Sequence, residues 1–417
     1  MLKPVQLLFL KLLRQFRTSE KIEQTAAPAP EEWGELLKLS VQHHVVPMIY
    51  EGVGRMPAFV SCPEAFKKEW KRCACSQVIL QTRRTGAFLD LYREMTEEGL
   101  APLVVKGLVC RELYAKPDFR ISGDEDLLLP AGELQKMDAF LQSRGYERQG
   151  ELNVYETTYR NRKTQVFLEV HTSLLPEEDA SFAALNEEFR RVFEQKQKLE
   201  IDGYAVYTLN DTSHFFYLLC HSYKHFVHSG FGVRQLCDIL MMAERSGKNM
   251  DWEEIIRKTK KYRMYVFWMN LMDIGERYLG FDWEGSHCPR PEDLALDSEA
   301  LLLDMLEGGV YGSSSTGRVH SANITLGALE RASRGEEGKL SLKSSLFPPK
   351  QYLKGEYPWL EKAGWLLPAA WILRLLRYGG KIWRKKRAGE TQLNSISVGK
   401  QRVELLRKYG ILGKDGR

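Results

Sequence analysis

Two aspartates, one residue apart in an apolar segment, constrain this chain more than any other feature. Asp124 and Asp126 lie between Ile121 and a run of three leucines. In a β-strand, alternate side chains point to one face, so the two carboxylates would lie side by side and Glu125 would point to the opposite face. Like charges at that spacing repel each other unless a cation lies between them. The segment 121–129 is therefore predicted to be a strand that carries a metal site.

A third acidic residue lies in a second strand-like segment, at residues 166–171. Glu169 is flanked there by apolar side chains, and His171, two positions later, shares its face. Burying an unpaired carboxylate costs free energy, so Glu169 needs a cation, which would be a metal ion or one of two arginines, Arg111 and Arg120. Three acids on neighbouring strands would form an oxygen-rich site for Mg²⁺ or Mn²⁺, with positions left open for substrate phosphates.

A calcium loop of the EF-hand type is an alternative for the aspartate pair. Such a loop requires a glutamate at its twelfth position. Counted from Asp124, that position is Gln135, so the pattern excludes the EF-hand loop.

A Lys-Gly dipeptide precedes the aspartates. Lys106 and Gly107 follow the apolar segment 103–105, a predicted strand, and precede residues 108–114, a predicted helix. Glycine lets the backbone approach a phosphate closely, and the N-terminus of a helix attracts anions. We therefore expect Lys106 and the backbone of Gly107 to hold phosphates, with Arg120 either assisting or pairing with an acid.

Three motifs, taken in order, resemble those of a known family: Lys106-Gly107, then Arg120-Ile121-Ser122-Gly123-Asp124-Glu125-Asp126-Leu127, then Glu169-Val170-His171. The chain resembles the nucleotidyltransferase fold of the DNA polymerase β superfamily. More closely, it resembles a bacterial family described as uncharacterised nucleotidyltransferases. It departs from the superfamily pattern at Leu108, because many members have serine or glycine after the glycine of this turn. The usual serine contact to a phosphate is therefore absent.

The resemblance implies Mg²⁺- or Mn²⁺-dependent transfer of a nucleoside monophosphate from an NTP, such as ATP, to an unidentified acceptor. It implies that three acids are catalytic and bind the metal: Asp124, Asp126 and Glu169. It implies that a second group contacts the nucleotide: Lys106, Gly107, Arg120, Gly123 and His171. The alternative is a non-catalytic nucleotide-binding or protein-interaction module in a glycan-assembly or toxin–antitoxin setting. The acid trio argues against that alternative, since a scaffold has no evident need of three clustered carboxylates.

The resemblance also sets the expected fold, which is α+β. We expect a polymerase-β-like nucleotidyltransferase core, a small mixed sheet with helices, inside mainly helical N- and C-terminal regions. The 417 residues are enough for two or three domains. The expected regions are 1–98 (helical), 99–209 (nucleotidyltransferase core), 210–350 (helical, with a mobile loop at 312–317) and 351–417 (helical and rich in Trp and Arg).

Four histidines lie close together in a segment predicted to be helical: His214, His221, His225 and His228. The spacings of seven and four residues place the first three near one helix face. Zinc is one interpretation, but the segment lacks an H-E-x-x-H motif and an acidic ligand at suitable spacing. We expect a wall of the active-site cleft or a helix-packing face instead. Further along, Arg234 and Asp238 are predicted to form an intrahelical ion pair.

Composition excludes several classes of protein. The chain has 43% hydrophobic and 28% charged residues, as an ordinary globular protein does. A net charge of +5 is too small to indicate a nucleic-acid binder, for which a clustered basic face is expected. The seven cysteines form no C-x-x-C pair and are typical of reduced thiols in a cytoplasmic protein. The predicted location is therefore cytoplasmic.

The C-terminal region combines tryptophans with basic residues between Trp359 and Arg387. Its longest apolar run, Trp365 to Leu373, has nine residues and covers less than half of a bilayer. We expect a helical element docked on the body of the protein. The alternative is a peripheral membrane contact, because tryptophan with arginine and lysine is typical of an interfacial helix. Flotation with anionic liposomes would separate the two.

Overall fold

The computed structural model divides the chain into two compact units. One comprises Met1–Tyr223 and Gly232–Val310, and the other comprises Lys224–Phe231 and Tyr311–Arg417. These limits fall elsewhere than those of the four predicted regions, and that division stays a prediction.

The structure describes residues 2–20, 28–153, 155–177, 180–228, 230–291, 294–309, 325, 350–353, 357–360, 363–373 and 393–412. The predicted loop at 312–317 and the basic stretch 374–387 lie outside the described residues. Within them, every helix is too short or too polar to cross a membrane.

The N-terminal part of the first unit is helical, as predicted. Its first helix is amphipathic and buries one face, including Phe9 and Leu12. Arg17, near the end of this helix, donates two hydrogen bonds to the carbonyl of Leu279 and so ties the N-terminus to a helix far along the chain. Proline occupies the first turn of four of these helices, where its missing N–H is not needed. The helices are α1 (Pro4–Thr18), α2 (Pro30–Gln42), α3 (Val46–Val53), α4 (Pro57–Val60) and α5 (Glu64–Glu97).

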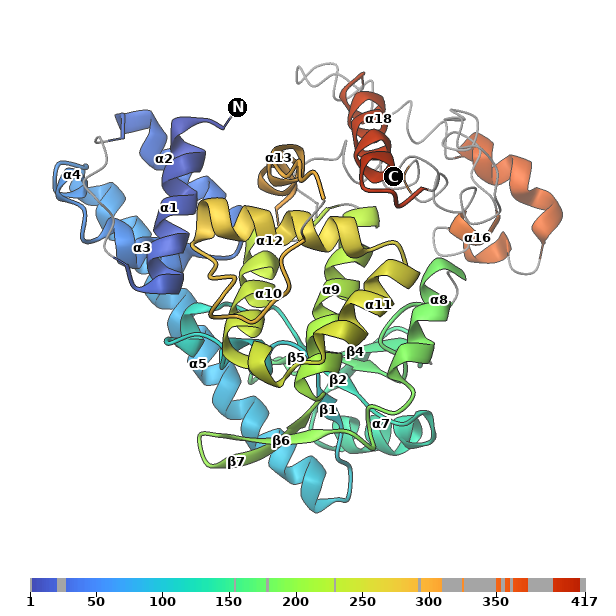
Figure 1. Cartoon of the computed structure of the whole chain (residues 1–417). Coiled ribbons are helices and arrows are strands. Elements are labelled where there is room, and N and C mark those ends of the chain that lie inside the picture. The colour runs from blue at the N-terminus through green and yellow to red at the C-terminus, as the bar shows by residue number, and fades with distance from the viewer. Residues whose placement is uncertain are drawn as a thin grey trace. The chain divides into compact units, whose positions relative to one another are not determined.

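A five-stranded mixed sheet follows (Figure 1), in the order β1-β2-β5-β4-β3. The central pair, β2 with β5, is parallel, and the other neighbours are antiparallel. The α+β fold with a small mixed sheet is therefore confirmed. The strands are β1 (Leu103–Val104), β2 (Glu125–Leu128), β3 (Glu147–Gln149), β4 (Glu156–Arg160) and β5 (Phe167–His171).

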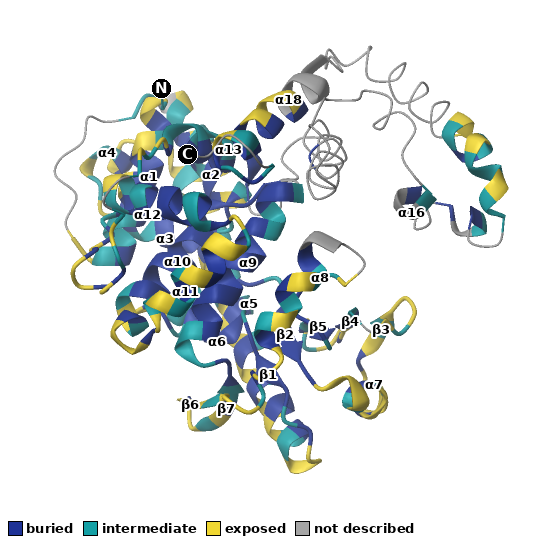
Figure 2. Cartoon of the chain, turned by 45° about the vertical axis from the view of Figure 1, so that its right-hand side comes forward, coloured by how far each residue is buried: buried dark blue, intermediate teal, exposed yellow. Residues whose placement is uncertain are grey.

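The two faces of the sheet differ in polarity. Leu127, Leu168 and Val170 point to one face and join a core with helices α5 and α7 (Leu134–Ser143). From α5 this core takes Phe88 and Tyr92, which are fully buried. Each such side chain stabilises the fold by roughly 1.5–3 kcal/mol. Figure 2 shows β1 and β2 as buried, whereas β3 at the edge is largely exposed. The opposite face of the sheet carries the polar residues of the candidate site.

A separate two-stranded hairpin, β6 (Gln197–Ile201) with β7 (Tyr204–Thr208), confirms the turn predicted at Asp202-Gly203. Both turn residues have positive φ, 50° for Asp202 and 81° for Gly203. That conformation is the one that the twist of a two-residue hairpin requires.

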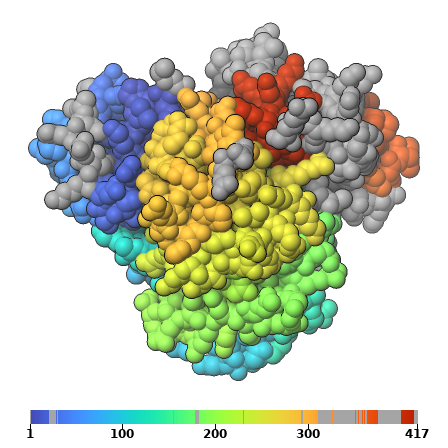
Figure 3. All heavy atoms as spheres, viewed as in Figure 1, coloured from blue at the N-terminus to red at the C-terminus, as the bar shows by residue number. Residues whose placement is uncertain are grey.

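Helices form the rest of the first unit, and in Figure 3 the green to orange segments from α8 to α13 make up much of its visible surface. Asp251 caps one of them by accepting a hydrogen bond from the backbone N–H of Glu254. The longer helices are α8 (Ala180–Asn186), α9 (Asp211–His228), α10 (Val233–Ser246), α11 (Trp252–Lys261), α12 (Tyr265–Leu279) and α13 (Glu299–Gly308). The shorter turns are α6 (Leu108–Arg111), η1 (Pro117–Phe119), η2 (Ala131–Glu133), η3 (Glu187–Phe189) and η4 (Gly247–Asn249).

The second unit contains short helical segments and one longer helix: α16 (Lys350–Leu353), η5 (Pro358–Leu360), η6 (Gly364–Leu366) and α18 (Leu393–Lys408). Leu367 and Trp371 pack against a small apolar cluster that includes Leu360 and Ala370. Trp365 is 81% exposed. The described part of the predicted 359–387 element is thus a series of turns and helical residues with one packed side.

Two predicted elements are shorter than expected. The strand predicted at 121–129 is β2, which begins at Glu125, so Asp124 precedes it. The helix predicted at 108–114 ends at Arg111. The apolar pattern extends beyond each element because Leu113, Tyr114 and Leu129 are buried without being part of a helix or strand.

Candidate functional site

The parallel pairing of β2 with β5 forms the candidate site. Its register places Asp126 opposite Glu169, and His171 follows on the same face of β5. One ligand atom from each of these three residues lies within 4.8 Å of the other two. Two carboxylates and an imidazole at this spacing are a suitable donor set for a divalent cation. We call Asp126, Glu169 and His171 the acid–histidine cluster.

Unsatisfied polar atoms in the cluster support that assignment. Asp126 Oδ2 and both ring nitrogens of His171 are buried and have no hydrogen-bond partner among the described residues. His171 Nε2 lies 3.7 Å from Asp126 Oδ1 and 3.8 Å from Glu169 Oε2, which is too far for a hydrogen bond. Buried polar atoms without partners cost free energy unless an ion or ligand satisfies them. The cluster therefore fits a bound cation.

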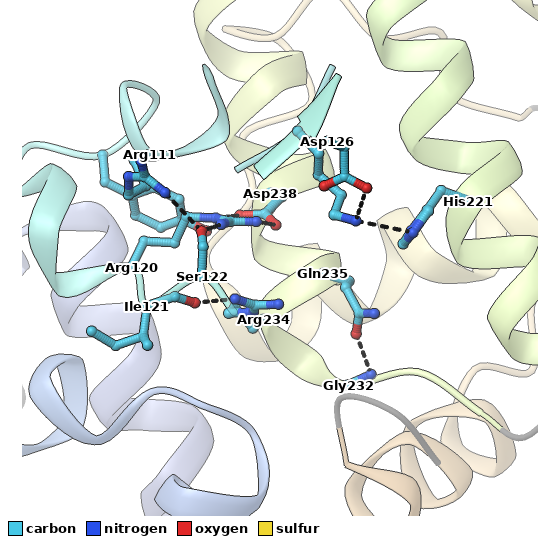
Figure 4. A network of polar contacts seen from close by, with 12 residues as sticks. Arg111, Arg120, Ile121, Ser122, Asp126, His221, Gly232, Arg234, Gln235 and Asp238 are labelled. Atoms are coloured by element: carbon cyan, nitrogen blue, oxygen red, sulfur yellow. Dashed lines mark hydrogen bonds and ion pairs between the residues drawn. The ribbon is translucent and has the colours of Figure 1, made fainter. Parts of the chain in front are cut away.

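Lys106 supplies positive charge beside the cluster. Its Nζ lies 2.8 Å from Asp126 Oδ1 and 3.3 Å from Nε2 of His221 on α9. In Figure 4 these two contacts are the dashed lines drawn to the labelled Asp126 and His221. Lys106 follows β1, the strand that pairs with β2, and this neighbourhood brings the ammonium group to the aspartate. The lysine that was predicted to hold phosphates is thus also the counter-ion of a cluster acid.

The pKa values of the cluster residues reflect both burial and repulsion between neighbouring carboxylates. Burial, together with the carboxylates of Asp126 and Asp124, raises the pKa of Glu169 to about 9. Burial alone would also raise the pKa of Asp126, but Lys106 and His171 outweigh it and hold that pKa well below its ordinary value. Burial likewise opposes the charge on Lys106, yet Asp126 and Asp124 keep its pKa well above the ordinary value. Without a further cation, only part of the acidic charge is present.

Two tyrosines lie beside the cluster. The Tyr155 ring is 5.7 Å from the His171 ring, and Tyr217 lies one helical turn before His221, with the two rings 5.9 Å apart. Burial raises the pKa of Tyr155 and of Tyr217, so both hydroxyls stay protonated near neutral pH. Sequence reasoning missed both tyrosines. The helical spacing of Tyr217 from His221 was the available signal.

The space beside the Lys106-Gly107 turn is occupied by the side chain of Glu125. Gly107 has a φ of 52°, and a Cβ there would lie 2.1 Å from Glu125 Oε2. The same carboxylate accepts a 2.6 Å hydrogen bond from the backbone N–H of Leu108 and forms a 2.6 Å ion pair with Arg111. Glu125 does point away from the cluster, as predicted, but it occupies the start of α6. The expected backbone phosphate cradle at Gly107 is therefore taken by an internal carboxylate.

Arg120 is also committed to an internal contact. Its guanidinium donates to both carboxylate oxygens of Asp238 on α10, at 2.9 and 2.6 Å, and to Ser122 Oγ at 2.6 Å (Figure 4). Tyr114 donates a further 2.8 Å hydrogen bond to Asp238. Arg120 is only 1% exposed. Of its two predicted roles, the geometry supports the ion pair with an acid and not the phosphate contact, because the guanidinium is buried away from solvent.

The segment before β2 is held from two helices. Arg234, on α10, donates to the carbonyl of Ile121, and Gln81, on α5, accepts a 2.8 Å hydrogen bond from the N–H of Ser122. Asp238, which was predicted to pair with Arg234, has Arg120 as its ion-pair partner. These contacts fix the position at which the chain enters β2.

Asp124 and Gly123 lie in the bend just before β2. Asp124 is half-buried and is not one of the three clustered ligands. Its carboxylate is nevertheless near enough to raise the pKa of Glu169. The predicted trio of Asp124, Asp126 and Glu169 is therefore one residue different from the structural cluster, in which His171 takes the third place.

The histidines of α9 have separate surroundings. His214 Nε2 contacts the carbonyl oxygen of Val105 at 2.9 Å, and burial lowers its pKa to about 4. His221 lies beside Lys106, in keeping with the predicted wall of the cleft. Among the described residues, the acid–histidine cluster is the group suited to a metal, and it includes no histidine of α9.

A polar cavity of about 550 Å³ lies elsewhere, near the start of α9. Its basic residues include Lys258, which is buried and paired with Glu254 at 2.6 Å, and Arg191, which is paired with Glu194 at 2.9 Å. No residue of the cluster lines this cavity. The cluster has a better donor set for metal chemistry than this cavity, so we place the candidate site at the cluster.

Comparison with known proteins gives one match. A family model described as uncharacterised nucleotidyltransferase matches residues 29–280, which is more than half of the chain. The matched range contains all the strands of both sheets, the cluster, Lys106 and His221. No curated protein and no solved structure matched the chain.

Proposed function

The chain belongs to the uncharacterised nucleotidyltransferase family, and from this premise we propose that it transfers a nucleoside monophosphate from an NTP to an acceptor hydroxyl or phosphate. The observation that carries the proposal is the β2–β5 register, which brings Asp126, Glu169 and His171 to one point on the polar face of the sheet. The family supports nucleotidyl transfer in general. The dependence on a metal and on an NTP is our inference from the cluster.

Asp126, Glu169 and His171 would hold Mg²⁺ or Mn²⁺, with Asp124 close by. Such a cation would neutralise phosphate charge and lower the pKa of an acceptor hydroxyl. Carboxylates suit both metals, and an imidazole ligand favours Mn²⁺, because Mg²⁺ is a hard cation that takes oxygen ligands.

The chain's own residues supply the rest of the site. Lys106 places a fixed positive charge beside Asp126, and burial gives that charge more effect than it would have in water. His221 and Tyr217, one turn apart on α9, bring polar groups to the same region. In the proposed reaction an acceptor oxygen forms a bond to the α-phosphorus, and a hydroxyl acceptor gives up its proton to solvent. The bond between the α-phosphorus and the α–β bridging oxygen breaks, and pyrophosphate leaves with that oxygen and the electron pair.

Incubation with each α-labelled NTP and Mg²⁺ or Mn²⁺ tests the proposal. Purified protein is supplied with a cell extract as the source of acceptor, and labelled products are sought among proteins and metabolites. We expect transfer with at least one NTP and its loss in Asp126→Asn. Binding of NTP without transfer would favour the non-catalytic nucleotide-binding module. Absence of both would refute the nucleotidyltransferase assignment.

A further inference from the structure

The proposed site needs positively charged side chains to bind a polyphosphate, but the candidates nearest to the cluster already pair with acidic residues. Arg120 is bound to Asp238, and Arg111 is bound to Glu125. Lys106 is shared with the cluster. A triphosphate carries several negative charges, so further positive groups near the cluster are required.

Two arginines meet at one aromatic ring at the start of β5. The guanidinium of Arg84, on α5, lies over the Phe167 ring at 5.6 Å from its centre, and that of Arg160, at the end of β4, lies at 5.1 Å. These distances are within the range of cation–π attraction. Arg160 is the direct cross-strand partner of Phe167. One phenylalanine therefore positions two guanidinium groups from different elements.

Among the residues that the structure describes, neither guanidinium has an ion-pair partner. Of the ion pairs between described residues, none includes Arg84 or Arg160, and the Nε of Arg84 is buried without a hydrogen-bond partner. Nearby Arg162, by contrast, pairs with Glu147 at 3.0 Å. Arg84 is half-buried and Arg160 is exposed. A guanidinium that no carboxylate neutralises is free to bind an anion.

The sheet register places this pair beside the cluster. Glu125 is paired with Leu168, so Phe167 lies level with Asp124, two positions before Glu169 on the same face. Arg84 reaches this point from α5, where Gln81, one turn earlier, binds the N–H of Ser122. The carboxylates of Glu125 and Asp124 are near enough to act on the Arg84 pKa, which burial lowers.

We propose that Arg84 and Arg160, held over Phe167, bind the polyphosphate of the nucleotide next to the acid–histidine cluster. That the anion belongs to a nucleotide rests on the proposed function. That the two arginines bind a polyphosphate rests on the geometry alone. Guanidinium groups suit phosphate oxygens because they offer several donors in a planar fork. The charged phosphates would then lie between two arginines at one end and the cluster at the other.

Inorganic tripolyphosphate with saturating Mg²⁺ is the probe, because it carries no base and needs no acceptor. Binding is measured by calorimetry for the full chain and for Arg84→Gln and Arg160→Gln. Each neutral variant should weaken binding about 10-fold or more, since a hydrogen bond to a charged group contributes about 1.5–3 kcal/mol. Arg84→Lys and Arg160→Lys should keep part of the affinity. Arg83→Gln, on the exposed neighbour of Arg84, and Arg162→Gln serve as matched controls and should bind as the unchanged protein does.

The outcomes separate this inference from the proposed function. Equal tripolyphosphate affinity in all variants, or none in the unchanged protein, would overturn the arginine site even if labelled transfer occurs. Affinity that depends on Arg84 and Arg160 supports the anion site even if no NTP is a substrate, in which case only the proposed function fails. Thermal unfolding of each variant shows whether it is folded, and the lysine variants keep the test decisive if a glutamine variant is not.

Discussion

Removing one member of the Arg120–Asp238 pair should destabilise the protein severely without acting on nucleotide affinity. Asp238 is 2% exposed, and it accepts hydrogen bonds from Arg120 at 2.9 and 2.6 Å and from Tyr114 at 2.8 Å. In Asp238→Asn the guanidinium stays buried without its counter-ion. Leaving such a charge uncompensated costs about 3–5 kcal/mol. We expect a loss of that size, and a similar loss in Arg120→Met.

The assay is urea unfolding followed by circular dichroism at neutral pH, with the slope m compared between variants. Arg162→Met, which breaks the exposed pair with Glu147, is the matched control and should cost at most about 1 kcal/mol. The double variant Arg120→Met with Asp238→Leu should lose less than the sum of the single losses, because no unpaired charge remains.

A loss below about 1 kcal/mol for Asp238→Asn, at unchanged m, would refute the reasoning, because it would mean that the buried guanidinium is solvated some other way. A specific loss of NTP affinity in folded Arg120→Met would also contradict it. That result would return Arg120 to the phosphate role that the sequence first suggested.

Three further outcomes are expected. Glu169→Gln should weaken Mn²⁺ binding in calorimetry, because one of the two cluster carboxylates is lost; unchanged affinity would remove Glu169 from the metal site. Gly107→Ala should lower the free energy of unfolding, measured in urea, by about 1–3 kcal/mol, because its φ of 52° and the contact with Glu125 both exclude a side chain. An unchanged free energy of unfolding would contradict this. Burial lowers the pKa of His214 from 6.5 to about 4, so its contribution to stability is complete above pH 6.5 and is lost as the pH falls through 4, at about 1.4 kcal/mol per pH unit. In a His214→Gln variant the free energy of unfolding should therefore fall less steeply with decreasing pH. An identical pH dependence in the two proteins would contradict the assignment of a lowered pKa to His214.

Sequence pattern predicted the faces of the strands well. The alternation of side chains along a strand predicted that Glu169 and His171 share one face and that Glu125 lies on the face opposite Asp126. The structure has both arrangements. This works because the side-chain period of a strand is a local property. The resemblance supplied what periodicity does not, namely that the strands of Asp126 and Glu169 are neighbours.

The ion-pair partners were not predictable in the same way. Arg120 and Asp238 are 118 residues apart, and spacing along the chain carries no information about such a contact. The same reason hid the Glu125–Arg111 pair, although a glutamate within an apolar strand does signal that some buried cation must exist. A sequence thus reveals that a buried charge needs a partner before it reveals which one.

The placement of β5 between β2 and β4 has a consequence for how the chain can be divided. A fragment that ends before Phe167 would keep Asp126 but leave the hydrogen-bonding edge of β2 open along Glu125–Leu128. An open strand edge is a template for pairing with other chains and so for aggregation. The two halves of the site are therefore expected to be inseparable in truncation or domain-transfer experiments, and a working minimal fragment must extend at least through His171.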